Sequence, residues 1–397
     1  MEKLDSNHVW AAIIAGGQGT RLFPLSHESC PKQFCRLNDD STFIQATIKR
    51  FLNLGIKTTQ VVVITTNKNQ TALAKEQTQA LGVLSQNICQ ISPNFGYAGA
   101  MVRAAEFIRK LDENAIIVNT PADQYIVEDE NFNETMKNAI AGAKLGHAVI
   151  VGVKINDIVT VQGCGHALYD PEIEAIYHDV TGFVEKPDRK RADELMRNDC
   201  SACNTGINAW SAKTLLNVVS STSFTRKSLE TDVLMKKLGA VKLVVGKFHW
   251  YDCGTLKALY EISAKTPHHK NASLGKGEIE RTDCKSSLFY AIEGVRLRAT
   301  GVENTAVLAT EIEGRIVITV VNLDESQRVK DLANDYKKNK SFLMDDFQVR
   351  ARNNIIMRTN ISEEIRVGFV GVQDYAVYSH KSGDGAIEIA VSQQIVE

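Results

Sequence analysis

The chain lacks three features that would each define a class of protein: a long apolar run, an excess of charge of one sign, and a dense set of cysteines. No stretch of about 18 consecutive apolar residues occurs among its 397 residues, so we expect no membrane-spanning helix. Its 46 lysines and arginines balance 47 aspartates and glutamates at a formal net charge of −1. This balance excludes the basic surface of a non-specific binder of nucleic acid or anionic membrane.

The eight cysteines are too sparse for a disulfide framework in a chain of this length, so we expect reduced thiols. The first ten residues, MEKLDSNHVW, lack the basic, apolar and small-residue order of a secretion signal. Together these features predict a cytoplasmic protein. With 44% apolar and 23% charged residues the composition is that of a globular chain, and the length suits two or three domains.

Apolar, β-rich runs alternate with helical periodicity in the first part of the chain, which predicts parallel βαβ units in a first domain of residues 1–264. Expected strands lie at residues 9–15, 61–65, 88–91, 115–119 and 148–153, and expected helices at residues 42–54, 67–81, 98–111 and 129–146. An antiparallel insertion is expected at residues 157–185, and further helices at residues 188–198, 212–219 and 229–238.

The pattern changes after residue 264, where short β-rich runs separated by glycines predict a second domain of residues 265–340. Residues 341–397 again contain short strand-like runs. They form either an extension of unknown role or a continuation of the second domain. The clusters of strands fit irregular solenoid coils, although no constant repeat period occurs.

The first expected strand runs directly into a glycine-rich loop that contains Gly16, Gly17, Gly19 and Thr20. Glycines after the first strand of a parallel sheet let backbone amides approach phosphate oxygens, and Arg21 adds a cation. The loop is not a dinucleotide fingerprint, because leucine stands at the third glycine position and a proline follows two residues later. The P-loop sequence is absent too. A phosphate-binding loop and a purely structural turn both remain open at this point.

Lys32 places a second cation 11 residues after Arg21, in the segment Pro31–Phe34. Two cations in one extended loop suit a polyphosphate. Taken alone, Lys32 is more simply interpreted as a solvated surface lysine.

Six segments, in this order, resemble the signature of the sugar-phosphate nucleotidylyltransferases, particularly the mannose-1-phosphate guanylyltransferases. They are Gly16–Ser26, Pro31–Phe34, Pro121–Asp123, Phe183–Pro187, Asn204–Gly206 and Trp250–Thr255. The resemblance implies an α/β domain with a Rossmann-like, mixed and mostly parallel sheet, followed by a smaller β-rich domain similar to a left-handed β-helix. It extends broadly to residue 340, and residues 341–397 match nothing in the family's pattern.

The resemblance also implies the reaction. An oxygen of a hexose 1-phosphate attacks the α-phosphorus of a nucleoside triphosphate and pyrophosphate leaves, so two polyanions must be held in line with their charge neutralised. GTP and mannose 1-phosphate, which give GDP-mannose, are the expected pair of substrates.

By this resemblance, Arg21 and Lys32 would hold the triphosphate and stabilise the leaving pyrophosphate, and Lys186 would pair with the phosphate of the sugar. Asp123 and Asp252 would complete the catalytic set as ligands of Mg²⁺, which prefers carboxylate oxygens and bridges phosphates. Both follow expected strands and would meet at one edge of the sheet. The remaining implied contacts are those of Gly16, Gly17, Gly19, Thr20, Pro121 and Ala122 with the nucleotide, and those of Gly165, Glu185 and Asn204 with the sugar.

The segment beside the base departs from the family. Where the family usually reads Gly-Arg-Asn-Thr-Ala-Pro-Ala, residues 94–100 read NFGYAGA. Because a base is selected by hydrogen bonds to its edge, another nucleobase stays open. The sugar stays open too, because Cys164 and His166 flank Gly165. A different class of function is a catalytically silent sugar-nucleotide sensor that regulates a partner, and a dinucleotide-dependent reductase ranks third. Formation of a homo-oligomer also stays open.

Two further groups of residues are weak evidence for a metal or redox site. Cys200 and Cys203 have the CxxC spacing of zinc or redox sites, but no second such pair accompanies them. The adjacent His268 and His269 are expected to be solvent-exposed loop residues.

Overall fold

A computed structural model provides the structure of the chain. It describes residues 4–17, 19–36, 41–92, 96–170, 176–220, 241–339, 365–370, 372, 375–381 and 386–393. The helix expected at residues 229–238 lies outside the described residues.

Contacts between Cα atoms divide the chain into two compact units. Unit 1 comprises Met1–Gly17 and Ser41–Asp252, and unit 2 comprises Gln18–Asp40 and Cys253–Glu397. The contacts therefore assign the segment with Arg21 and Lys32 to unit 2, although its sequence lies within the expected first domain. The domain boundaries expected at residues 264 and 340 stay predictions.

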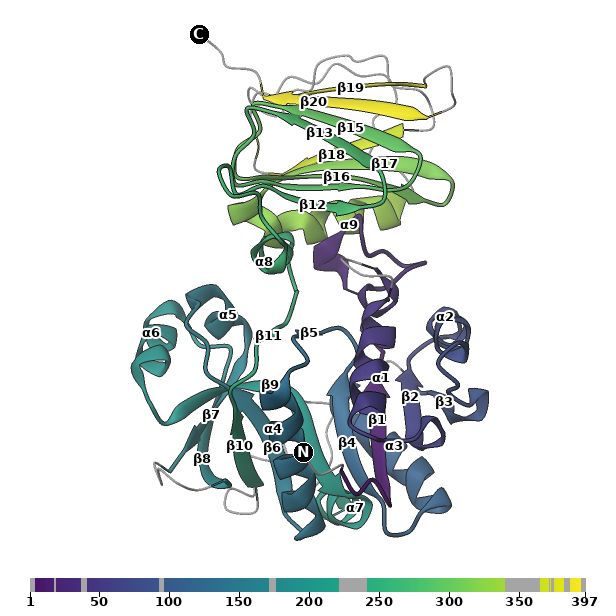
Figure 1. Cartoon of the computed structure of the whole chain (residues 1–397), viewed down its shortest axis with the longest axis vertical. Helices are drawn as coiled ribbons and strands as arrows, with labels where there is room; N and C mark the ends of the chain where they lie inside the picture. The colour runs from purple at the N-terminus through teal and green to yellow at the C-terminus, as the bar shows by residue number, and fades with distance from the viewer. Residues whose placement is uncertain are drawn as a thin grey trace. The chain divides into compact units, whose positions relative to one another are not determined.

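Unit 1 contains a nine-stranded sheet with the order β3-β2-β1-β4-β9-β6-β10-β8-β7. Its strands are β1 (Val9–Ile14), β2 (Val61–Thr65), β3 (Ile88–Gln90), β4 (Ile116–Pro121), β6 (Ala148–Val153), β7 (Gly165–Tyr169), β8 (His178–Glu185), β9 (Ser201–Ser211) and β10 (Val241–Gly246). Its helices are α1 (Phe43–Asn53), α2 (Lys68–Gln79), α3 (Gly96–Leu111), α4 (Glu130–Lys144), α5 (Ile158–Gly163), α6 (Arg189–Arg197) and α7 (Ala212–Ser220). Helices α1, α3 and α4 pack on the strands (Figure 1).

The alternation predicted for residues 9–153 is confirmed within a few residues at each boundary. Strand β2 is apolar and buried along almost its whole length, as a strand covered on both faces must be. Helix α3 buries Met101, Ala105 and Ile108 on one face, as its periodicity predicts. Helices α2 and α4 begin at Asn67 and Asp129, whose side chains accept hydrogen bonds from backbone N–H groups of the first turn.

The sheet is mixed, but parallel pairs do not predominate in the described strands. Parallel pairing joins β3, β2, β1 and β4 and also joins β6 to β10. Strand β9 runs antiparallel to β4, β6 and β7, and β8 runs antiparallel to β7 and β10. The expectation of a mostly parallel sheet is therefore wrong for the half that contains β9, a strand that the sequence pattern did not predict.

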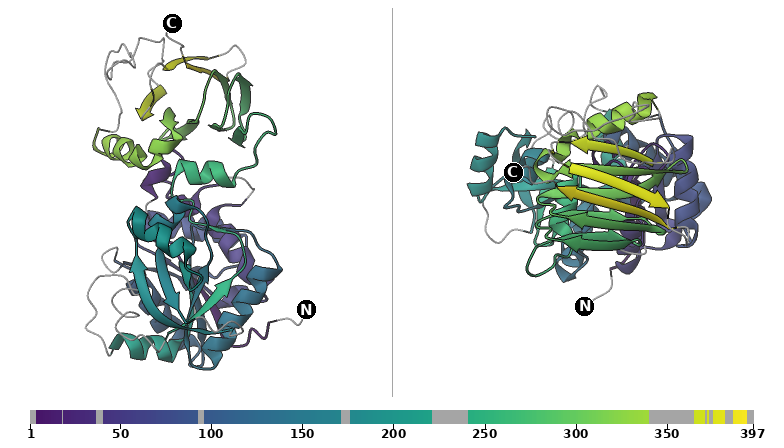
Figure 2. Two further views of the ribbon diagram at one scale, coloured as in Figure 1. Left: turned by 90° about the vertical axis from the view of Figure 1, so that its left-hand side faces the viewer. Right: turned by 90° about the horizontal axis from the view of Figure 1, so that it is seen from above.

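Unit 2 contains two sheets. Strands β12 (Ala272–Gly275), β14 (Leu288–Ala291), β16 (Thr305–Ile312), β17 (Arg315–Asn322) and β18 (Ile365–Val370) form one, and β13 (Glu278–Thr282), β15 (Val295–Thr300), β20 (Ile387–Gln393) and β19 (Tyr375–Lys381) form the other. Buried residues of both sheets, including Phe289, Val307, Leu297 and Ile389, form the core between them. Figure 2 shows the sheets as stacked layers.

Successive strands from β12 to β16 alternate between the two sheets, so the chain coils. Ala272 pairs with Leu288, and Leu288 pairs with Ala306, so one coil takes 16 residues and the next takes 18. This inequality, together with the antiparallel strands β17 and β19, explains why the sequence shows no constant period. The β-rich second region agrees with the expectation, and its left-handed coiling stays a prediction.

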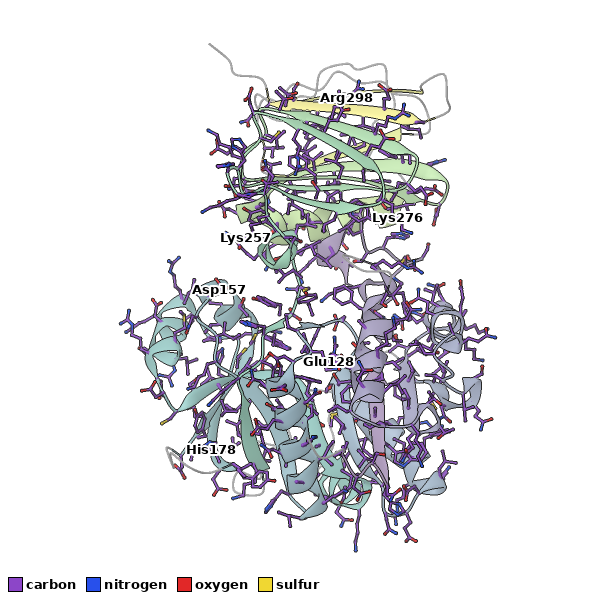
Figure 3. The ribbon with its side chains drawn as sticks, in the orientation of Figure 1. Glu128, Asp157, His178, Lys257, Lys276 and Arg298 are labelled. Carbon is purple, nitrogen blue, oxygen red and sulfur yellow. The ribbon has the colours of Figure 1, made fainter. Side chains whose placement is uncertain are left out.

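Opposite charges face each other across the outermost coil. Arg296 Nε donates to Glu278 at 3.1 Å, and Arg298 Nε donates to Glu280 at 2.8 Å. These are directly opposite pairs of the parallel strands β13 and β15. Arg298, labelled in Figure 3, also donates to a carboxylate oxygen of Glu388 on β20 at 3.3 Å.

The segment that contains Arg21 is held by apolar packing in unit 2. Leu22, Phe23 and Leu25 are buried in one cluster with Leu256 of helix α8 (Leu256–Ile262) and Leu308 of β16. The 3-10 helices η1 (Thr20–Leu22) and η2 (Lys32–Phe34) follow from this anchoring, because their apolar side chains are buried. Helix α9 (Val329–Asn339) adds Val329 to the same cluster.

Within the part of the chain that the structure describes, no helix has both the length and the apolar character to cross a membrane.

We expect Leu22→Ala to destabilise unit 2 by about 2–5 kcal/mol, because it removes a side chain that is 1% exposed from the centre of a core. Hydrogen exchange of the amides in β14 and β16 under native conditions would measure the loss. Thr300→Ala, at an exposed residue of β15 in the same unit, serves as the control and is expected to stay within about 0.5 kcal/mol of the parent. Equal effects of the two substitutions would contradict the assignment of Leu22 to the core.

Candidate functional site

The glycine-rich loop and Pro121–Asp123 lie side by side in unit 1 because β1 and β4 are parallel neighbours. Their last residues, Ile14 and Pro121, are paired, and the N–H of Ala122 donates to the carbonyl of Ile14 at 3.0 Å. Both segments therefore leave the sheet at the carboxyl ends of adjacent strands, where ligands of open α/β sheets bind.

Two side chains orient the carbonyls of Gly16 and Gly17. Gln70 Nε2 donates to the carbonyl oxygen of Gly17 at 3.1 Å and to that of Gly16 at 3.4 Å, and Thr66 Oγ1 donates to Gly16 at 3.2 Å. Because a trans peptide places C=O and the following N–H on opposite sides, the N–H of Gly17 is directed away from Gln70. Gln70 is fully buried. The sequence pattern did not single it out, and its only signal is a polar residue in the first turn of a helix that follows a buried strand.

The remaining residues of the expected phosphate loop belong to unit 2. Gly19 has φ 67°, and a Cβ at this position would lie 2.5 Å from the Cβ of Lys32, so both conformation and space require glycine. Lys32 is 2% exposed, so its interpretation as a solvated surface lysine is wrong. Thr20 and Arg21 form the beginning of η1, and Arg21 is exposed.

Asp123 and Asp252 adjoin two very short strands of unit 1, β5 (Tyr125–Ile126) and β11 (Trp250–Tyr251). These strands are antiparallel, and Tyr251 pairs with Tyr125, their rings 6.2 Å apart between centroids. One step beyond this pair, Asp252 stands opposite the residue that follows Asp123. Asp123 and Asp252 therefore lie at the same end of this ladder.

The carboxylate of Asp252 also acts electrostatically on a residue of β9. Burial raises the pKa of the Cys203 thiol well above its usual value, and the neighbouring Cys164 and the carboxylate of Asp252 raise it further. Cys203 directly precedes Asn204. Asp252 and the expected sugar-binding segment of β9 are therefore neighbours in unit 1.

Gly165 and Glu185 face each other at the ends of β7 and β8. A Cβ at Gly165 would lie 2.5 Å from the Phe183 ring and 2.7 Å from Glu185 Oε2. The close approach of these two side chains therefore explains why residue 165 is a glycine.

Lys186 has an unusual backbone and an exposed side chain. Its φ of 42° lies in the left-handed region, which costs about 1–2 kcal/mol for a residue with a Cβ. Its N–H donates to the carbonyl of Cys164 at 3.1 Å, and its Nζ lies 3.6 Å from Glu185 Oε1. With 69% of the side chain exposed, the ammonium is accessible to an anionic ligand. Backbone strain of this kind is concentrated at functional sites.

Asn204 begins a turn in β9 whose backbone is held by other elements. Its Oδ1 accepts from the N–H of Gly206 at 3.2 Å, while Tyr97 and Gln124 donate to carbonyls of the turn. Neither Tyr97 nor Gln124 was assigned such a role from the sequence. Contacts between a side chain and a backbone about 80 to 110 residues away leave no local pattern that sequence reasoning could detect.

The other groupings have ordinary surroundings. His166 is 3% exposed, its Nε2 lies 2.9 Å from the carbonyl oxygen of Val161, and burial lowers its pKa. His268 and His269 are exposed. Among the described residues, no group of three or more His, Cys, Asp or Glu residues could enclose a metal ion. Mg²⁺ does not need such a group, since one or two carboxylates and substrate phosphates commonly hold it. Asp123 and Asp252 fit this donor set.

Comparison with known families gives a match to the nucleotidyl transferase family over residues 10–269. The mannose-1-phosphate guanylyltransferase of Escherichia coli is 26% identical in an alignment of length 355 that covers 81% of this chain and 74% of that protein. The alginate biosynthesis protein AlgA of Pseudomonas aeruginosa is 26% identical in an alignment of length 352 that covers 81% of this chain and 71% of that protein.

Among solved structures, a mannose-1-phosphate geranyltransferase from Thermus thermophilus is similar over 83% of this chain and 100% of that chain. The TM-score is 0.69 and the sequence identity is 25%. The similarity extends beyond residue 269 and therefore includes part of unit 2.

We expect Gly165→Ala to destabilise unit 1 by about 1–3 kcal/mol, because the added methyl group overlaps Phe183 and Glu185. Gly163→Ala is a close control: it lies two residues away, and a Cβ there would meet no atom within 4 Å. Urea unfolding followed by tryptophan fluorescence suits the comparison, since Trp10, Trp210 and Trp250 all lie in unit 1. A Gly165 variant as stable as the Gly163 variant would contradict the close contacts.

Proposed function

Since this chain belongs to the nucleotidyl transferase family, we propose that it transfers GMP from GTP to mannose 1-phosphate and releases pyrophosphate. The family makes it an enzyme that transfers nucleotidyl groups. The relatives named above support the choice of the two substrates. The observation that carries the proposal is the pairing of β5 with β11, because it places Asp252 at the same end of one ladder as Asp123, which follows the end of β4 by two residues.

In the proposed reaction, a phosphate oxygen of the sugar substrate forms a bond to the α-phosphorus of GTP as the bond to pyrophosphate breaks. No covalent intermediate with the protein is needed, so catalysis consists of alignment and neutralisation of charge. Lys186 pairs with the phosphate of the sugar, and its exposed ammonium on a fixed backbone supports this role. Glu185 accepts hydrogen bonds from sugar hydroxyls, and the Asn204 amide donates a hydrogen bond to one.

The nucleotide is assigned to the loop after β1 and to Pro121 and Ala122. The hydrogen bonds from Gln70 and Thr66 to the Gly16 and Gly17 carbonyls support this, because they fix the backbone of the loop at the end of β1. Arg21 and Lys32 hold the triphosphate and stabilise the leaving pyrophosphate. Asp123 and Asp252 would hold Mg²⁺, which when bound neutralises phosphate charge.

A second candidate is the same reaction with another base. Residues 93–95 of the segment beside the base lie outside the described residues, but Tyr97 is described, and its hydroxyl is engaged with the carbonyl of Gly206. A tyrosine so engaged offers the base edge different groups from the polar triplet usual in the family, which favours testing other nucleotides.

The test is pyrophosphate release in the presence of Mg²⁺, with GTP, ATP, UTP, CTP and dTTP each paired with mannose, glucose, galactose and fucose 1-phosphates. Release with GTP and mannose 1-phosphate alone is the expected result. A different productive pair would replace the proposed substrates. No release with any pair, together with retained nucleotide binding, would favour the sensor.

We expect Asp252→Asn to lower kcat by about 100-fold or more while the KM for the sugar 1-phosphate changes less than about threefold. The reason is that charge at this position acts where negative charge develops in the transition state. Steady-state kinetics measures both constants. Unchanged turnover would remove Asp252 from the site.

Asp179→Asn is the control for this substitution. Asp179 lies on β8, six residues before Glu185, and forms an exposed ion pair with Lys242 at 2.8 Å. Figure 3 labels its neighbour His178, which lies at the opposite end of this part of the molecule from the labelled Asp157. Exposed pairs of this kind contribute little, so near-normal kinetics is expected.

A further inference from the structure

The turn formed by residues 204–206 is held by groups from three other elements of unit 1. The hydroxyl of Tyr97, in the first turn of α3, donates to the carbonyl oxygen of Gly206 at 2.6 Å. Gln124 Nε2, between β4 and β5, donates to the carbonyl oxygen of Thr205. Thr205 Oγ1 donates to the carbonyl oxygen of Val151 on β6 at 2.8 Å. These bonds hold the turn against α3, the end of β4 and β6 at once.

The turn also has little freedom of its own. Gly206 has φ 75°, and a Cβ there would lie 3.2 Å from Pro121 Cγ, in the segment expected to contact the nucleotide. The N–H of Gly206 donates to Asn204 Oδ1 at 3.2 Å. That N–H belongs to the peptide between Thr205 and Gly206, whose carbonyl accepts from Gln124, whereas the carbonyl that accepts from Tyr97 belongs to the following peptide. The two peptides share the Cα of Gly206, so the bonds from Gln124 and Tyr97 together fix the conformation of the glycine whose N–H orients the Asn204 amide.

Loss of the Tyr97 hydrogen bond leaves no buried polar group of the turn without a partner, so it has little cost for folding. The carbonyl of Gly206 also accepts from Asn208 Nδ2 at 3.3 Å. Loss of the phenol hydroxyl therefore leaves this carbonyl with a partner, and the large cost of an unpaired buried polar group does not arise. The ring of Tyr97 still packs on the core cluster of α3 and β1. Removing the hydroxyl alone thus changes how the turn is held and leaves the packing intact.

From these contacts, we propose that Tyr97 is a positioning residue for the sugar substrate: its hydroxyl holds the carbonyl side of Gly206, the residue whose N–H orients the Asn204 amide. This inference rests on the proposed function, in which Asn204 binds a sugar hydroxyl. Tyr97 lies in the segment beside the base, but the effect proposed for it is on binding of the sugar. Tyr97 would then determine the affinity for the hexose 1-phosphate and leave the nucleotide's affinity unchanged.

The test is Tyr97→Phe in the full chain, compared with Tyr177→Phe. Tyr177 is a matched control, since its hydroxyl also donates to a backbone carbonyl of unit 1, that of Asn138 on α4, at 3.0 Å. We expect Tyr97→Phe to raise the KM for the sugar 1-phosphate about fivefold, the effect of one net hydrogen bond. The kcat and the KM for the nucleotide are expected to stay within about twofold, and the Tyr177 variant is expected to behave like the parent. A change in nucleotide KM alone, or no change, would overturn the proposal.

Hydrogen exchange provides a readout that does not depend on the reaction. Amides of residues 203–208 are expected to exchange faster in the Tyr97 variant and at the parental rate in the Tyr177 variant. Unchanged exchange at these amides would overturn the proposal even in an active enzyme. A parent chain that releases no pyrophosphate with any pair would refute the proposed function and, with it, the sugar role of Tyr97, and exchange would then decide only whether Tyr97 holds the turn.

Discussion

Strand β9 pairs with β4, β6 and β7, and these three pairings arrange the sugar-side half of unit 1. Pairing with β4 brings Gly206 beside Pro121, and pairing with β7 sets Cys203 opposite His166, next to Gly165. The β9 chain passes through the turn at Asn204 between these two contacts. An antiparallel strand thus joins two regions that a purely parallel sheet would separate by a crossover connection.

Apolar packing makes the segment after β1 part of the core of unit 2. Residues that read as a signature for phosphate binding include Leu22, Phe23 and Leu25, which are buried with residues of α8 and β16. Their neighbours Gly19 and Lys32 are so close that no side chain fits at position 19. Within fewer than 20 residues, the motif therefore supplies both apolar side chains for a core and the cations of a loop.

Much of unit 1 could be predicted from the sequence because its strands and helices are long and periodic. The apolar runs at β1, β2 and β6 are buried as expected, and α3 shows its predicted face. Strand β9 was missed because SACNTGINAWS contains small and polar residues and a single β-branched aliphatic one. Strands β5 and β11 have two residues each, too few for any periodicity, so the ladder that has Asp123 and Asp252 at one end could not be predicted.

The site shows the same division between local and long-range information. The residues assigned to ligand binding lie in segments that can be recognised in the sequence. The residues that orient them do not. Gln70 and Tyr97 act through hydrogen bonds to backbone atoms roughly 50 to 110 residues away. Only the folded chain brings these donors to their acceptors.

The ion pairs between β13 and β15 have a consequence for how the coil ends. Among the described strands, β13 has one neighbour, so its other edge presents backbone groups to which a foreign strand could add. Glu278, Glu280 and Arg281 are exposed on this edge strand, and charged side chains oppose the addition of another sheet. The acidic residues that pair with β15 therefore also oppose edge-to-edge addition of a strand from another copy.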